Sequence, residues 1–166
     1  MSNYSVKYRR LSTPELEQLK DDFVKFLATN SIAADDWEQM KKNDNEKAIG
    51  MIDIFSDMVF DRAISKIKFL ELRTEKELRV FKCNDAHIEL VGLTVDESKG
   101  LDLTNGDALK QLASGEILLE NYGPKMYTSE KEYEESREQE LFKMMDMGCV
   151  PAPEALYMGL KSMIKG

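Results

Sequence analysis

The sequence predicts an α+β fold in which N-terminal helices pack on a small three-stranded antiparallel sheet and the C-terminal half is helical. From residue 12 to 65, apolar residues recur three and four positions apart, as on one face of a helix. The spacing then changes to two, as in half-buried strands, and helical signals return after residue 96. We therefore expect a single domain with these parts: a flexible basic arm at 1–10, helices at 11–65, an antiparallel meander at 66–95, and a mostly helical region at 96–166.

Three helices are predicted before residue 66. The first, at 12–28, begins with a capping box, because Ser12 precedes Glu15 by three residues. The second, at 34–42, has acidic residues at its start and lysines at its end, as the helix dipole favours. The third, at 46–65, is apolar on so many sides that we expect it to be central or packed against a partner.

Three strands follow, at 66–72, 78–83 and 87–95. Asn84 and Asp85 form a two-residue turn between the second and the third strand, which is typical of a hairpin. Because so small a sheet needs a helix on one face to be stable, we expect the upstream helices to cover it.

The C-terminal half contains further helix signals. Thr104 or Asn105 is expected to cap a short helix, and Pro153 begins a final one. Between them, Ser129 and Glu132 form a second possible capping box, which predicts a charged helix over 128–147.

Charge and hydropathy exclude several classes of protein. The net charge of −8 disfavours nucleic-acid binding, which needs a basic face. No stretch approaches the ~18 apolar residues of a membrane span, and the N-terminus has no secretory h-region, so we expect a cytoplasmic protein. The basic residues Lys7, Arg9 and Arg10 favour a solvated terminus or, alternatively, an arm that docks on an acidic partner.

The sequence contains few residues in the patterns that known catalytic motifs require. Cys83 and Cys149 form neither a CxxC pair nor a disulfide framework, and we expect buried, reduced thiols. His87 is the one histidine, which excludes metal sites that need two histidines from one chain. Neither a glycine-rich phosphate loop nor a GxSxG or HExxH motif occurs.

Asp53, Asp57 and Asp61 are the most specific feature, because their spacing of four places them on one stripe of the helix at 46–65. The simplest interpretation is a narrow solvated face. The alternatives are an ion pair with a distant arginine or a partner, and a site for a divalent cation such as Mg²⁺.

A second polar group runs from the turn at Asp85 into the strand at 87–95. Asp85, His87 and Glu89 alternate there, so they would share one face of the sheet. A histidine beside carboxylates suits a general base or a metal site. The outward polar face of an antiparallel strand explains the same alternation, and we favour that interpretation.

Several strings resemble a family of small uncharacterised bacterial proteins, mostly from flavobacteria and their relatives. They are Lys7–Leu11, Phe26–Ile32 with Asp36–Glu38, and Asp53–Asp57, and the resemblance is clearest over residues 7–95. It implies a bacterial cytoplasmic protein and carries over no activity, cofactor or site residue.

From these observations we expect a non-catalytic interaction or regulatory module without a cofactor, which binds a protein partner or forms a homodimer. Arg9, Arg10, Trp37 and His87 are the candidate interaction residues. One alternative is a cation-dependent enzyme or ligand binder that uses the helical carboxylates with Mg²⁺. Another is an acidic partner that neutralises a basic protein through a contiguous acidic face including 128–147.

Overall fold

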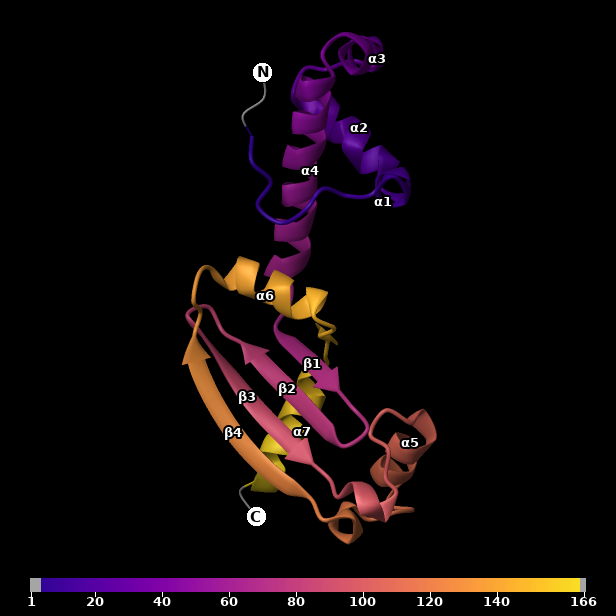
Figure 1. Cartoon of the computed structure of the whole chain (residues 1–166), viewed down its shortest axis with the longest axis vertical. Coiled ribbons are helices and arrows are strands. Elements are labelled where there is room, and N and C mark those ends of the chain that lie inside the picture. The colour runs from indigo at the N-terminus through magenta and orange to yellow at the C-terminus, as the bar shows by residue number, and fades with distance from the viewer. Residues whose placement is uncertain (1–3, 165–166) are drawn as a thin grey trace. The chain divides into compact units, whose positions relative to one another are not determined.

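The computed structural model describes residues 4–164, and the chain divides into two compact units (Figure 1). The first, Met1–Ser65, is called the helical unit here, and the second, Lys66–Gly166, the sheet unit. Within residues 4–164, no helix combines the length and the apolar composition that a membrane crossing requires. The expected arm at 1–10 is described from residue 4 onward, and its first three residues lie outside the described part.

The described part of the helical unit, residues 4–65, contains four helices: α1 (Thr13–Gln18), α2 (Lys20–Thr29), α3 (Ala34–Asn43) and α4 (Asn45–Ser65). The predicted helices at 34–42 and 46–65 are confirmed. The predicted helix at 12–28 is instead two helices, because Leu19 departs from helical geometry with φ −104° and ψ 19°. Residues on both sides of the break, Leu16 and Phe23, pack against one core.

Aromatic contacts hold the helical unit together. The buried residues of its core are Leu11, Phe26, Leu27 and Phe55. The ring of Phe55 lies 5.1 Å from that of Phe23 and 5.4 Å from that of Phe26, measured between centroids. Such tilted aromatic pairs add about 0.5–1.5 kcal/mol each beyond the area that they bury.

In the sheet unit, residues 66–164 are described, and they form five strands and three α-helices. The strands are β1 (Phe69–Arg73), β2 (Glu77–Cys83), β3 (His87–Thr94), β4 (Lys125–Glu132) and β5 (Val150–Pro151). The helices are α5 (Gly106–Ser114), α6 (Arg137–Asp146) and α7 (Glu154–Ile164), with short 3₁₀ turns at Glu97–Lys99 and Leu119–Tyr122. All strand pairs are antiparallel, in the spatial order β4-β3-β2-β1-β5.

The expected antiparallel meander at 66–95 is present as β1, β2 and β3. The sheet nevertheless has five strands rather than three in the described residues, and the predicted helix at 128–147 is wrong. Residues 125–132 form β4, and the helix begins only at Arg137, where Ser136 caps it in place of Ser129. Because β4 is an edge strand with its second half exposed, it lacks the apolar alternation that reveals a strand. A helical C-terminal half is therefore only partly correct, since α5, α6 and α7 alternate with β4 and β5.

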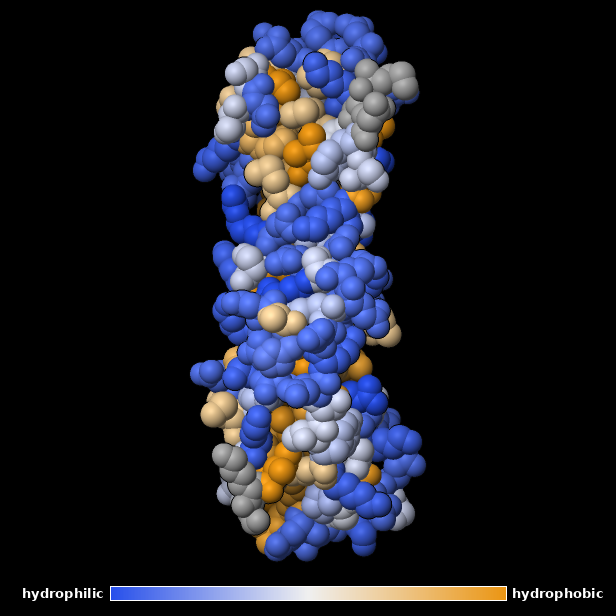
Figure 2. Space-filling view, turned by 90° about the vertical axis from the view of Figure 1, so that its left-hand side faces the viewer, coloured by the Kyte–Doolittle hydropathy of each residue, from blue (hydrophilic) through white to orange (hydrophobic). Residues whose placement is uncertain are grey.

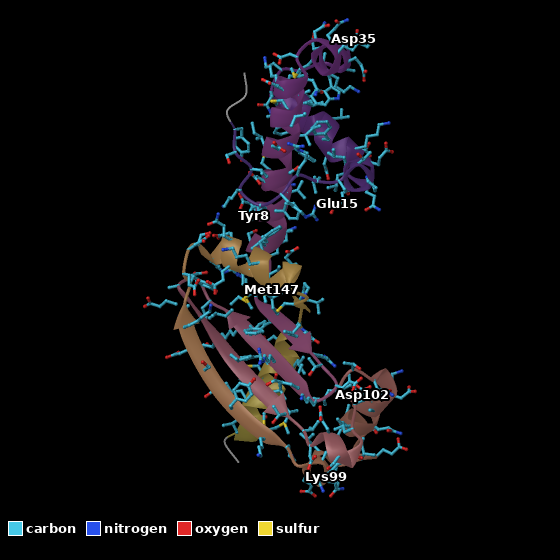
Figure 3. All side chains as sticks on the ribbon, viewed as in Figure 1. Tyr8, Glu15, Asp35, Lys99, Asp102 and Met147 are labelled. Carbon is cyan, nitrogen blue, oxygen red and sulfur yellow. The ribbon has the colours of Figure 1, made fainter. Side chains whose placement is uncertain are left out.

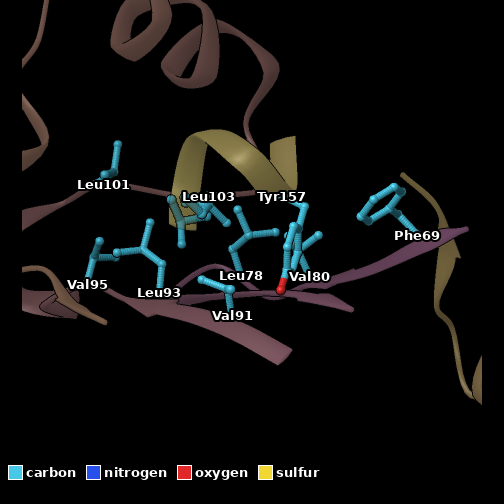
Figure 4. Close-up of a cluster of buried hydrophobic side chains, with 10 residues drawn as sticks. Phe69, Leu78, Val80, Val91, Leu93, Val95, Leu101, Leu103 and Tyr157 are labelled. Atoms are coloured by element: carbon cyan, nitrogen blue, oxygen red, sulfur yellow. The ribbon is translucent and has the colours of Figure 1, made fainter. Parts of the chain in front are cut away.

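The helix that covers the core of the sheet also differs from the expectation. It is α7, which follows the strands in sequence, rather than a helix that precedes them. Tyr157 of α7 packs against Phe69 with ring centroids 5.4 Å apart, and both belong to one buried cluster with Val80 and Val91 (Figure 4). The sheet unit thus supplies its own covering helix.

Both units expose some large apolar side chains. Figure 2 shows hydrophobic surface, in orange and tan, bordered by hydrophilic residues in blue. On the helical unit these include Val24 and Met58, and on the sheet unit Met147, which is 81% exposed. Apolar residues that are exposed singly are normal on protein surfaces and do not by themselves mark a binding site.

Candidate functional site

The acidic stripe of α4 is not a solvated face. Asp53 and Asp57 are only 6% and 4% exposed, whereas Asp61 is partly exposed. Residues 4–11 contact α4, and Figure 3 shows Tyr8 beside this helix. The simplest interpretation of the sequence is therefore wrong for the two buried carboxylates, because buried carboxylates require partners.

Asp57 is the central acceptor of this contact. One of its oxygens accepts hydrogen bonds from the hydroxyl of Tyr4 and, at 2.8 Å, from the backbone amide of Lys7. The other oxygen accepts a hydrogen bond from the backbone amide of Tyr8 at 3.1 Å. The hydrogen bond to this carboxylate raises the pKa of Tyr4 to about 12, because a phenolate beside it would be repelled.

The carboxylates on either side of Asp57 form ion pairs. Arg10 donates two hydrogen bonds to Asp53, at 2.6 and 3.1 Å. Asp61 accepts hydrogen bonds from Lys7 and Tyr8. Burial alone would raise the pKa of Asp61, but these two donors outweigh burial and lower it.

These contacts therefore agree with the alternative in which the stripe forms ion pairs with distant basic residues of the same chain. A divalent cation at Asp53, Asp57 and Asp61 would have to displace the donors from all three carboxylates. The cation site at these residues remains a prediction, and the occupied oxygens make it less favourable.

The docked N-terminal segment also fixes the beginning of α1. The amide of Leu11 donates to the hydroxyl of Ser56 on α4 at 2.9 Å. The expected capping box between Ser12 and Glu15 is present, and Arg9 donates to both oxygens of Glu15 at 2.8 and 2.9 Å. The stripe thus anchors the segment that leads directly into α1.

An apolar groove lies among α1, α2, α3 and α4. Its volume is about 600 Å³, a size typical of ligand pockets. The apolar side chains that line it are Leu16, Phe23, Val24, Leu27, Ile32, Ala34, Trp37 and Ile52. Val24 is 55% exposed in this groove, so apolar surface here faces solvent.

Trp37 forms one wall of the groove and is the only candidate interaction residue from the sequence that lines it. Its ring packs edge-on against Phe23 at 5.2 Å, and Lys41 lies 5.9 Å from the ring centre. Charged side chains also line the groove: Glu17, Lys20, Asp35, Glu38 and Lys41. Lys41 pairs with Glu38 at 2.9 Å.

The other three candidate interaction residues lie elsewhere. Arg9 and Arg10 bind acids of their own unit, as described above, rather than extending as an arm toward a partner. His87 is on β3 of the sheet unit, where it lines a separate surface depression with Ala86, Glu130, Lys131 and Glu132.

The polar alternation on β3 is only partly as predicted. His87 and Glu89 share a face of β3, but Asp85 precedes the strand, in the turn. The third acidic or histidine side chain of this group is instead Glu130 of β4, which the strand register places opposite Glu89. No feature of the sequence could have revealed Glu130, since its position depends on a strand that the sequence does not predict.

The cysteines are buried and free, as predicted. Burial raises the pKa of the Cys83 thiol to about 11 and also raises that of Cys149. Both thiols therefore stay protonated at neutral pH, which disfavours nucleophilic chemistry.

The acidic face expected over 128–147 is divided between β4 and α6. Lys131 of β4 pairs with Glu140 of α6 at 2.6 Å, and Lys143 pairs with Glu135 at 3.2 Å. Two lysines therefore offset part of the acidic charge, which weakens the case for an acidic neutralising surface in this region.

Over residues 4–164 the fold is of the α+β class, with four helices in the helical unit and a five-stranded antiparallel sheet in the sheet unit. Residues 6–165 match the model of a family of unknown function, DUF6495, and the chain belongs to that family. The resemblance to an uncharacterised family is thereby confirmed. No curated protein and no solved structure matches the chain.

Proposed function

We propose that the helical unit is a protein-interaction module whose groove binds an apolar, helical segment of a partner protein. The observation that carries the proposal is the groove itself, where Phe23, Val24 and Trp37 present apolar surface among four helices. Grooves of this kind bind the apolar face of an amphipathic helix, through side chains spaced three and four residues apart.

The charges along the groove support a partner with basic residues beside its apolar face. Three acids and two lysines line the groove, and Lys41 is already paired with Glu38. Glu17 and Asp35 would then attract basic residues of the partner, which improves the association rate and the specificity more than the affinity.

The acidic stripe serves this function indirectly. Asp53, Asp57 and Ser56 hold residues 4–11 on α4, and α1 follows directly. Thr13, Leu16 and Glu17 of α1 are part of the groove lining. Loss of the stripe is therefore expected to weaken binding by displacing one wall.

The test uses a synthetic helical peptide with leucines at positions i, i+3, i+4 and i+7 and lysines between them. Binding is followed by the fluorescence of Trp37, the single tryptophan of the chain, which lies in the groove. A peptide of the same composition in scrambled order, without an apolar face, controls for attraction to an acidic protein.

Two matched variants locate the binding. Val24→Glu places a charge in the groove and is expected to abolish binding. Met58→Glu changes a residue of similar exposure outside the groove lining and is expected to leave binding intact. Equal binding of the scrambled peptide, or binding that survives Val24→Glu, would overturn the proposal. A concentration-dependent dimer that Val24→Glu disrupts would assign the groove to a second copy of the chain instead.

A further inference from the structure

A histidine and two glutamates converge on the sheet unit, apart from the groove. Their ligand atoms, one from each of His87, Glu89 and Glu130, lie within 4.8 Å of one another. The strand geometry causes this convergence. His87 and Glu89 are two residues apart on β3, and the antiparallel register places Glu130 of β4 directly opposite Glu89.

We propose that His87, Glu89 and Glu130 form a binding site for a divalent transition metal, with Zn²⁺ as the best-matched ion. One imidazole nitrogen and two carboxylate oxygens are three of the ligands that zinc takes in open sites, where water takes the fourth position. Ligands of a tetrahedral ion with bonds near 2.0 Å lie about 3.3 Å apart, so small side-chain rotations close the observed spacing.

The electrostatics of the pair favour a cation. Like charges directly opposite across two strands are destabilising, and Glu89 and Glu130 are such a pair. Lys82 lies 3.9 Å from Glu89 and is 42% exposed, so it offsets the repulsion weakly. Asn84 and Lys161 of α7 also favour the charged form of Glu89 and lower its pKa. A bound metal ion would offset the negative charges of both carboxylates.

A neighbouring residue holds two of the ligands in place. The side-chain amide of Asn84 donates to Glu89 at 3.1 Å and lies 3.3 Å from Nε2 of His87. Outer contacts of this kind orient metal ligands and raise affinity. The surface depression of about 490 Å³ beside His87 and Glu130 gives water and the ion access.

The first measurement is calorimetric titration of the full chain, without an affinity tag, with ZnCl₂. We expect one Zn²⁺ per chain and weaker binding of Mg²⁺, because imidazole is a poor ligand for that harder ion. His87→Ala and Glu130→Gln are each expected to reduce the affinity at least about tenfold. Asp85→Asn, a nearby acid in the turn, should leave it unchanged.

A second measurement does not depend on variants that fold. Because His87 is the single histidine, its imidazole resonances can be assigned directly by NMR. Addition of Zn²⁺ should shift them and saturate at one equivalent. Absence of saturable Zn²⁺ binding, or binding of equal strength in His87→Ala, would overturn the site. Equal binding in His87→Ala would mean that Zn²⁺ binds at another site of the chain, for example at the cysteines.

Discussion

The two units use clustered carboxylates in different ways. In the helical unit, Asp53 and Asp57 are buried, and arginine, tyrosine and backbone amide donors occupy their oxygens. In the sheet unit, Glu89 and Glu130 face each other across two strands near a histidine, with one lysine at 3.9 Å.

Acidic residues that stabilise the fold therefore differ from acidic residues that are available to bind a cation. Carboxylates that already accept several internal hydrogen bonds stabilise the fold, and a ligand must displace those donors. Carboxylates that repel each other cost the fold free energy, which a cation recovers on binding. Changing an acid to a neutral residue should therefore have opposite effects on stability in the two units.

The largest effect is expected for Asp57→Ala. This change leaves the amides of Lys7 and Tyr8 without their acceptor, so we expect the free energy of unfolding to fall by about 2–4 kcal/mol. Urea unfolding followed by Trp37 fluorescence reports on the helical unit. Asp61→Ala is the control, because this more exposed acid should cost less than about 1 kcal/mol. Equal losses from the two variants would contradict the distinction.

The next effect concerns the register that brings Glu89 and Glu130 together. Tyr127 of β4 lies over Gly92 of β3 and donates to Glu77 at 2.7 Å. A Cβ at Gly92 would lie 2.1 Å from the Tyr127 ring, so Gly92→Ala should cost about 1–3 kcal/mol. Thermal unfolding measures the loss. In a Tyr127→Ala background the same change should cost much less, and an undiminished cost would show that the ring does not cause it.

Glu130→Gln should have a smaller effect of the opposite sign. It removes the repulsion with Glu89, so we expect a gain of about 0.2–1 kcal/mol at low salt and without added metal. Asp53→Asn should lower stability instead, because it weakens the pair with Arg10. Melting curves followed by circular dichroism measure the change in stability of both variants. If both variants gain or both lose stability, the acids of the two units do not differ in the way proposed.

The smallest effect is a pH dependence at the beginning of α1. Hydrogen bonds from Arg9 and Ser12 lower the pKa of Glu15 from 4.5 to about 2. A folded-state pKa below the unfolded value contributes stability above about pH 4.5, and this contribution is lost as the pH falls toward 2. Because the pair is exposed, we expect only a few tenths of a kcal/mol. Unfolding at pH 3 and pH 7 measures it, and Glu15→Gln should remove this part of the difference.

Local signals in the sequence predicted much of the fold. The capping box at Ser12, the helices at 34–42 and 46–65 and the final helix after Pro153 all agree with the structure. The first three strands agree within a few residues. Helix caps and hydrophobic periodicity depend on neighbouring residues, so one sequence is enough to detect them.

The candidate site was less predictable. Trp37 was named from the sequence, but the groove around it needs four helices whose packing no local pattern specifies. Glu130 was missed because charged residues on an exposed edge strand resemble a charged helix. Strand pairing alone brought it to His87 and Glu89.

The sequence by itself determined the α+β class, most helices, the central hairpin and the conspicuous spacing of Asp53, Asp57 and Asp61. Only the tertiary structure decided what those carboxylates do, because their partners lie 43 to 54 residues earlier in the chain. The sequence favoured a solvated face for these carboxylates, whereas Asp53 and Asp57 are buried in the structure. A carboxylate in water needs no explanation, but one excluded from water must find donors, and the N-terminal segment supplies them.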